Sequence, residues 1–182
     1  QDINKAIHYY SLAANQNNPE ALFNLGFLLV KGTYISKNIP KAIRYFILSS
    51  EYRCIQAHFV VGFLYHEGKY INKDICKAIH YYKEGSTLNN QYSKNNLGIL
   101  YRFGEGEIQK NLGLANEYFK EAIKQKHDKI SMFNLAHIYM YEDIKYENDK
   151  LVKFLFHSSK QNFLPSQELL CIALIKINGY NI

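Results

Sequence analysis

Small and apolar residues recur at helical spacing along the chain, most regularly between residues 57 and 85. Ala57, Val61, Gly62 and Tyr65 share one stripe of a helix. A glycine inside a helix costs about 1 kcal/mol relative to alanine. Gly62 is therefore expected where another backbone comes close. The pattern predicts a helix that is packed along this stripe.

A second helix is predicted directly after the first. Gly68 is placed to end the first helix in the left-handed conformation, which is unfavourable for residues with a Cβ. Asp74 can accept the free amides at the start of the next helix. The second stripe has small residues at its ends and rings between them: Ala78, Tyr81, Tyr82 and Gly85. The two helices form an antiparallel hairpin that cannot bury both stripes alone.

The same hairpin pattern recurs through the whole chain. A small residue opens each second helix at intervals of 36, 36, 37 and 37: Ala6, Ala42, Ala78, Ala115 and Val152. A residue suited to cap the helix stands four positions before each one: Asp2, Asn38, Asp74, Asn111 and Asn148. The first helices align at Leu25-Gly26, Val61-Gly62, Leu97-Gly98, Leu135-Ala136 and Ile172-Ala173, with closing glycines at Gly32, Gly68, Gly104 and Gly179. Glu142 stands at the closing position of the fourth unit.

These repeats predict an all-α solenoid of antiparallel hairpins with a period of 36–37 residues. We expect one domain over 1–182, made of a leading second helix (2–17), four hairpins (19–52, 55–89, 91–126 and 129–161) and a last first helix (165–178). Because the helical pattern is already under way at residue 1, the chain is expected to be an excerpt of a longer protein.

The segment VGFLYHEGKYINKDICKAIHYYKEG, residues 61–85, resembles the Sel1-like repeat pattern LGxxYxxGxGVxxDxxKAxxWYxKAA. Sel1-like repeats are relatives of tetratricopeptide repeats. The resemblance covers essentially the whole chain, although Tyr or Leu replaces the Trp. It implies a right-handed α/α superhelix with the first helices on the concave side. Most members of the family are adaptors that hold protein partners, and one recruits misfolded proteins to a ubiquitin-ligase complex of the endoplasmic reticulum.

By analogy with tetratricopeptide repeats, a ligand would contact first-helix positions that lie off the packing stripe. The first set follows the internal glycine: Phe27, Phe63, Ile99, His137 and Leu174. The second set lies one turn on: Val30, His66, Arg102, Met140 and Ile177. Phe27 and Phe63 are not required by the repeat pattern. They are either apolar anchors for a peptide or helix of a partner protein, or they pack on one another inside a tightly coiled solenoid.

Composition adds few constraints. The net charge of +6 comes almost entirely from lysines spread over several helices, so a nucleic-acid partner is not expected. Three cysteines, Cys54, Cys76 and Cys171, are too few for a disulfide framework and are expected to be buried or half-buried thiols. Together with the lack of Asn-x-Ser/Thr sites, they favour the cytoplasm slightly. No apolar run is long enough to span a membrane.

The residues do not predict catalysis. The seven histidines lack the spacing of a helical zinc site, and no phosphate-binding loop or nucleophile elbow occurs. We therefore expect no enzyme activity, no cofactor and no metal. Three functions remain open: an interaction scaffold that binds a partner segment in its concave groove, an adaptor for degradation at the endoplasmic reticulum, and self-association through the apolar last helix.

Overall fold

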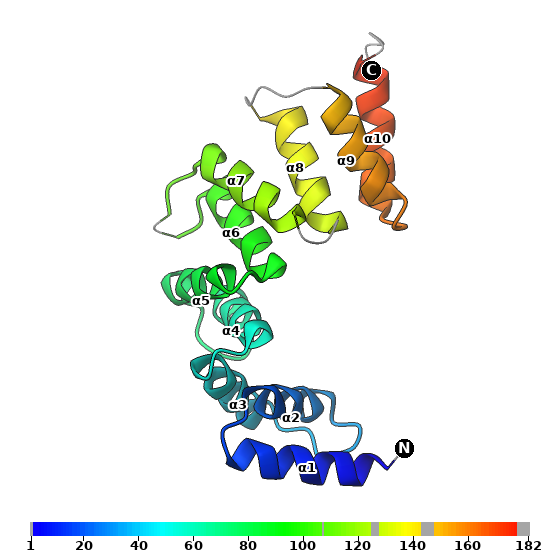
Figure 1. The fold of residues 1–182 in the computed structure, drawn as a ribbon. Helices are drawn as coiled ribbons and strands as arrows, with labels where there is room; N and C mark the ends of the chain where they lie inside the picture. Colours follow the sequence, from blue (N-terminus) through cyan, green and yellow to red (C-terminus); the bar gives the residue numbers. More distant parts are fainter. Residues whose placement is uncertain (1, 107, 125–127, 143–147, 178–182) are drawn as a thin grey trace. The chain divides into compact units, whose positions relative to one another are not determined.

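The computed structural model describes residues 2–106, 108–124, 128–142 and 148–177, and within these ranges it contains ten α-helices and no strand (Figure 1). The first helices of the repeats are α2 (Pro19–Lys31), α4 (Ile55–Glu67), α6 (Gln91–Phe103), α8 (Lys129–Tyr141) and α10 (Leu164–Ile177). The second helices are α1 (Ile3–Asn15), α3 (Ile39–Glu51), α5 (Ile75–Thr87), α7 (Leu112–Ile123) and α9 (Asn148–Ser159). The predicted all-α helical repeat is confirmed.

The helices divide into two compact units, Gln1–Ser93 and Lys94–Ile182. In the first unit, each helix from α1 to α5 packs against the next one along the chain, and in the second unit the same holds from α7 to α10. Each unit has its own core, built from the apolar stripes of these helices. A single domain over all 182 residues stays a prediction.

Glycines end the first helices as predicted. Gly32 and Gly68 both have φ of 68°, and their amides donate to the carbonyl oxygens of Leu28 and Leu64. Gly104 is also left-handed, with φ of 71°. Glu142, which replaces the glycine after α8, has an extended backbone instead. Gly179 lies outside the described residues.

Side-chain caps begin four of the second helices. The side chains of Asp2, Asn38, Asp74 and Asn111 each accept a hydrogen bond from the backbone amide three residues on, over 2.9–3.3 Å. Such a cap contributes about 1 kcal/mol to helix stability. The expected cap at Asn148 is wrong, because Asn148 is already the first residue of α9.

The reason is that the repeat register in α9 lies one residue earlier than predicted. The structure buries Leu151, Leu155 and Ser158 and leaves Phe156 exposed. The predicted register began at Val152, which would have placed Phe156 and Ser159 at the positions of Tyr82 and Gly85. Ser158 Oγ donates to Lys129 O over 2.7 Å, as Ser49 Oγ does to Pro19 O in the first complete repeat. Leu151 is therefore the counterpart of Ala42, Ala78 and Ala115.

At four of the boundaries between repeats the chain turns through a left-handed residue that is not a glycine. Asn17, Arg53, Asn89 and Asn162 have φ between 55° and 69°. Asparagine tolerates this conformation better than most residues with a Cβ. Each of them stands two positions before the first residue of the first helix that follows, so it marks where that helix begins.

The close approach predicted at Gly62 occurs, but it is made by a ring rather than by a backbone. A Cβ at Gly62 would lie 2.6 Å from the ring of Tyr82, and Gly26 and Gly98 have the same relation to Phe46 and Phe119. In these three repeats the aromatic residue of the second helix thus fills the space that the glycine of the first helix leaves.

Candidate functional site

The first unit carries exposed aromatic residues on its first helices. Phe27 in α2 and Phe63 in α4 are 48% and 44% exposed, although they are large apolar side chains. They occupy equivalent positions of the two complete repeats in this unit and so lie on the same face. We call these two residues with Phe23, Phe59 and Tyr92 the aromatic face.

The contacts within the aromatic face separate its structural members from its exposed members. Phe23 and Phe59 reach the second helices, with ring centroids 5.6 Å from Phe46 and 6.4 Å from Tyr82. Phe27 and Phe63 instead contact Phe23 and Phe59 of their own helices, at 6.4 Å and 6.1 Å. Both rings remain nearly half exposed, as a partner-binding role requires, and Lys31 Nζ lies 5.1 Å from the centroid of Phe27.

Tyr92 and Val30 extend the apolar surface of this unit. Tyr92 is 49% exposed and its ring centroid lies 5.4 Å from that of Phe59. Val30 is also exposed. His66 is half-buried, with its ring edge-on to Tyr82 and its Nδ1 3.5 Å from the Tyr82 hydroxyl.

The equivalent positions of α6 and α8 in the second unit are less exposed. Ile99 and Met140 are half-buried and pack against the core of this unit. Arg102 is only 7% exposed. These side chains contribute to packing, so any contact they make with a partner is limited to their exposed edges.

Arg102 belongs to a chain of polar contacts. Its Nη2 donates to His137 Nδ1 over 2.6 Å, and its Nε lies 3.6 Å from Glu142 Oε1. Glu142 Oε2 accepts a hydrogen bond from Lys110 Nζ over 3.0 Å. The sequence identified Arg102 and His137 as separate candidates but gave no sign of this network. Arg102 and His137 are 35 positions apart, and Lys110 and Glu142 are 32 positions apart, so only the fold brings them together.

The network sets the charge states of its members. An arginine cannot accept a hydrogen bond, so His137 must present an unprotonated Nδ1 to Arg102. Desolvation, reinforced by the positive charge of Arg102, lowers the pKa of His137. The hydrogen bond from Lys110 is the main reason that the pKa of Glu142 is also lowered, with Arg102 adding to it. A neutral histidine and an ionised glutamate therefore face the arginine.

His137 also lines a shallow pocket between α8 and α10. The pocket has a volume of about 290 Å³ and is lined by Phe133, His137, Tyr141, Pro165, Glu168, Leu169 and Ile172. The rings of Phe133 and Tyr141 flank His137, with centroids 5.9 Å and 4.6 Å from it. This mostly apolar pocket can take a side chain of a partner.

Glu168 and Ile172 were missed from the sequence because the register of α10 begins two residues earlier than predicted. Asn162 is the left-handed residue before this helix, and Ser166 Oγ lies 2.6 Å from Ser158 Oγ. Gly85 of α5 and Ser93 of α6 stand at the equivalent positions and also lie against each other. Ile172, and not Leu174, is thus the counterpart of Phe27, and Ile175 replaces Ile177 in the second set.

The remaining chemistry is limited. Among the described residues no group of three or more His, Cys, Asp or Glu side chains is arranged to hold a metal ion. All three cysteines are free thiols; Cys54 is buried, but Cys76 and Cys171 are exposed, so the expectation of burial is wrong for two of them. Of the described helices, none is long and apolar enough to cross a membrane.

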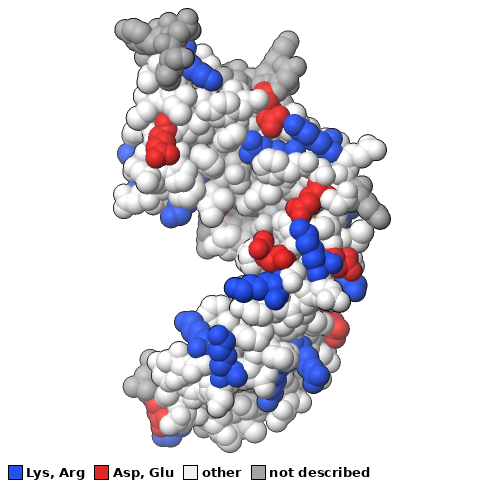
Figure 2. Space-filling model, turned by 180° about the vertical axis from the view of Figure 1, so that it is seen from behind, with Lys and Arg blue, Asp and Glu red and all other residues white. Residues whose placement is uncertain are grey.

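The face of the molecule shown in Figure 2 carries charges of both signs. On the face shown in Figure 2, Lys and Arg side chains are spread over the molecule and alternate with Asp and Glu. This distribution provides no argument for a nucleic-acid partner, which needs basic residues gathered on one face.

A family model described as Sel1 repeat matches residues 1–18, 19–51, 55–90, 91–127 and 129–143. No curated protein matches the chain. Among solved structures, a Sel1 repeat protein from Oxalobacter formigenes is 24% identical, with a TM-score of 0.83 over 91% of this chain and 67% of that one.

Two further structures are similar. The protective antigen c5321 from uropathogenic Escherichia coli, described as displaying an SLR fold, is 21% identical with a TM-score of 0.87. That match covers 96% of this chain and only 37% of the antigen. Cysteine rich protein B from Helicobacter pylori is 29% identical with a TM-score of 0.55, over 71% of this chain and 92% of that one.

Proposed function

Because this chain belongs to the Sel1 repeat family, we propose that it is a non-enzymatic scaffold that binds a segment of a partner protein on the side of its first helices. Sel1 repeat proteins are generally protein–protein interaction scaffolds. The observation that carries the proposal is the exposure of Phe27 and Phe63, which the packing of the repeats does not require.

The aromatic face fits an apolar partner segment. Burial of these adjacent exposed rings by a partner is favourable and stabilises the complex by about 25 cal/mol per Å² of apolar surface removed from water. Equivalent positions in successive repeats present the two rings at a regular interval. A helix or extended peptide with spaced apolar side chains can contact both.

The second unit offers a separate contact. The pocket between α8 and α10 can accept one apolar side chain against Phe133 and Ile172, with Glu168 available for a basic neighbour. His137 lines the pocket, and its Nδ1 accepts a hydrogen bond from Arg102, which holds the imidazole in place. We assign them a role in shaping this pocket.

The test is a comparison of partner binding by the intact chain and by a Phe27→Ala/Phe63→Ala variant. A partner is captured from a lysate of the source organism, identified by mass spectrometry, purified and measured by calorimetry. If both rings are binding hot spots, the variant should lose about 2 kcal/mol or more, which is about 30-fold in affinity. Tyr70→Ala, which removes another exposed ring in the first unit, serves as the matched control.

The thermal melting of the variant is part of the same test. Because Phe27 and Phe63 are nearly half exposed, their removal should leave helicity and melting temperature almost unchanged. A large fall in melting temperature would assign both rings to the core, and unchanged binding would remove the aromatic face from the function.

Self-association is the second candidate. Leu164, Leu174 and Ile177 of α10 are between 37% and 62% exposed, which gives this helix an apolar outer surface. Light scattering over a range of protein concentrations would show a rising mass, and a Leu164→Ser/Leu174→Ser variant should abolish the rise. The role as a degradation adaptor has no support in the family match or in the similar structures, so it is not part of the proposal.

A further inference from the structure

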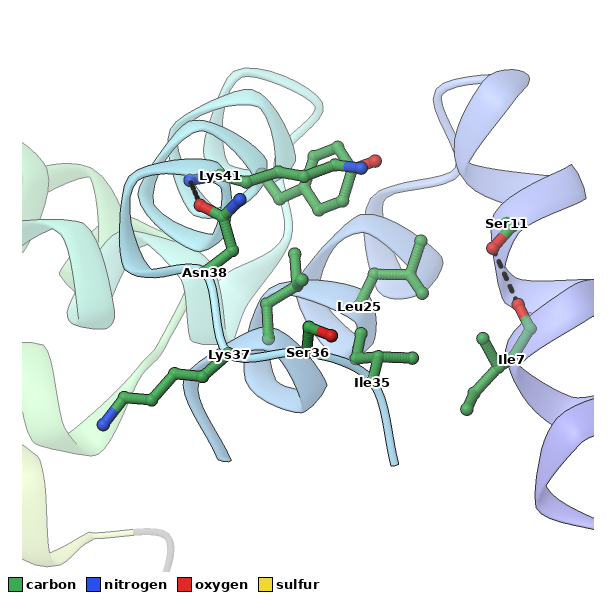
Figure 3. A pocket seen from close by; sticks show the side chains of 10 residues that line it. Ile7, Ser11, Leu25, Ile35, Ser36, Lys37, Asn38 and Lys41 are labelled. Atoms are coloured by element: carbon green, nitrogen blue, oxygen red, sulfur yellow. Dashed lines mark hydrogen bonds between the residues drawn. The ribbon is translucent and has the colours of Figure 1, made fainter. Parts of the chain in front are cut away.

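A pocket lies in the first unit between the second helices α1 and α3. Its volume is about 360 Å³ and its lining combines these helices with α2 and the α2–α3 loop: Ile7, Ser11, Leu25, Leu29, Ile35, Ser36, Lys37, Asn38, Lys41 and Tyr45. Figure 3 shows Ile7 on α1 facing Ile35 of the loop, with Leu25 of α2 between the helices. None of the aromatic-face residues lines it, so the pocket is distinct from the surface described above.

The pocket coincides with a departure from the repeat pattern. Tyr65, Tyr101 and Tyr139 occupy one position of the first helix in the next three repeats, and Leu29 occupies it here. Each of those tyrosines contacts a ring of its second helix, at 5.8 Å from Tyr81, 5.6 Å from Tyr118 and 6.5 Å from Phe154. The first two pairs are stacked within 10° of parallel. In this repeat the ring of the second helix is Tyr45. The first-helix residue that would stack on it is Leu29, which has no ring.

A second small residue enlarges the same space. Ser11 in α1 corresponds to Ile47 in α3, which packs in the cluster that contains Tyr65. The Ser11 hydroxyl donates to Ile7 O over 2.8 Å within its own helix. The two shorter side chains, Ser11 and Leu29, together leave the volume that Ile47 and Tyr65 fill one repeat later.

Lysines mark where an additional ring would lie. In the next repeat Lys77 Nζ lies over the ring of Tyr65, the tyrosine of the first helix, at 5.3 Å from its centroid. In this repeat the equivalent Lys41 Nζ lies 5.5 Å from the centroid of Tyr45 instead. A ring that entered the pocket would stack on Tyr45 and offer its own outer face to Lys41, which gives the order of groups seen around Tyr65.

We propose that this pocket binds a tyrosine side chain from an acidic segment of a partner protein, in the place where the other repeats insert their own tyrosine. The ten lining residues include Lys37 and Lys41 and no Asp or Glu. Lys41 is therefore available to the ring and to a neighbouring carboxylate, while Lys37 points away from the pocket in Figure 3 and favours acidic residues further along the segment. This site goes beyond the proposed contact with the first helices.

The first experiment uses p-cresol, which is the tyrosine side chain without its backbone. Titration of the intact chain, followed by amide chemical shifts, should show saturable binding with shifts at Ile7, Leu29 and Tyr45. 4-Methylcyclohexanol has the same substituents without the aromatic ring and should bind at least about tenfold more weakly. Absence of saturable p-cresol binding would overturn the proposal.

Two variants test the location. Leu29→Tyr supplies the missing ring from the chain itself and should reduce p-cresol affinity at least about tenfold while keeping or raising the melting temperature. Leu29→Phe is a second filling variant in case the hydroxyl is not accommodated. Undiminished binding by a folded filling variant would place the ligand elsewhere and refute the assignment. Tyr65→Leu should open part of the same space in the next repeat, where Ile47 remains, and add weaker shifts near Tyr81.

Short peptides test the preferred partner chemistry. Acetyl-Glu-Tyr-Glu-amide should bind more tightly than acetyl-Lys-Tyr-Lys-amide, and a Lys41→Gln variant should reduce that preference. The difference should shrink as salt is raised, because charges near the surface are screened. Equal binding of the two peptides by the intact chain would contradict the acidic part of the proposal.

Discussion

The ring of Tyr82 packs directly against Gly62, so that a Cβ on this glycine would lie 2.6 Å from Tyr82 Cδ1. Tyr82 is fully buried, and its ring cannot move away without disturbing the core. The same glycine–ring pairing joins Gly26 to Phe46 and Gly98 to Phe119. In the last complete repeat Ala136 stands at the glycine position and Leu155 at the ring position, both fully buried in one core cluster.

This pairing predicts a compensating double variant. Gly62→Ala should lower the free energy of unfolding by about 1–2 kcal/mol. The clash of the new methyl group with Tyr82 destabilises the fold more than the better helix propensity of alanine stabilises it. Tyr82→Leu alone should destabilise by creating a cavity. The double variant copies the Ala136–Leu155 pair and should lose less than the sum of the single losses, as measured by urea denaturation. Strict additivity would show that the two positions are not coupled.

The register of α9 predicts opposite behaviour for two adjacent residues. Leu155 is fully buried and Phe156 is 46% exposed. Leu155→Ala should therefore cost about 2–5 kcal/mol, while Phe156→Ala should cost less than about 1 kcal/mol. Thermal and chemical denaturation of the two variants distinguish this register from the predicted one, in which Phe156 would be the core residue.

A buried amide oxygen predicts a stabilising substitution in α7. Asn116 Oδ1 is buried without a hydrogen-bond partner in the described structure, and the equivalent positions of the preceding second helices hold Ile7, Ile43 and Ile79. Asn116→Ile should raise the free energy of unfolding by about 1 kcal/mol, because it removes an unsatisfied polar group and adds apolar contact. Asn116→Asp is the opposing control and should destabilise. A loss of stability in Asn116→Ile would contradict this account.

The hydrogen bond between Arg102 and His137 predicts a pH dependence. Since the pKa of His137 is lowered in the folded chain, the unfolded chain binds a proton first as the pH falls below about 6.5. The stability that His137 contributes is thus complete at higher pH, declines below about 6.5 and stops declining once the pH is below the folded pKa.

The measurement is the free energy of unfolding at pH 7.5 and pH 5.5 for the intact chain and for His137→Gln. The glutamine cannot titrate and keeps an acceptor for Arg102, so the variant should lose less stability on acidification than the intact chain. The remaining histidines and Glu142 are common to both proteins and act as the internal reference. An equal loss in both would show that His137 does not contribute to the pH response.

The sequence by itself determined the helical hairpins and their family. Glycines such as Gly68 and caps such as Asp74 act through the local backbone, so their effect can be read without knowing what packs nearby. The periodic small and apolar positions likewise predict which face of each helix is buried. For the same reason, Phe27 and Phe63 could be selected as positions off the packing stripe.

The tertiary structure decided the registers of α9 and α10 and the pairings that depend on them. A shift of one or two residues changes which face of a helix is buried, and loops of variable length hide that shift in the sequence. Only packing shows that Leu155 replaces Phe156, or that Ile172 joins His137 in a pocket. The Arg102–His137 bond and the space beside Leu29 have the same origin, because both depend on side chains that the fold brings together from distant positions.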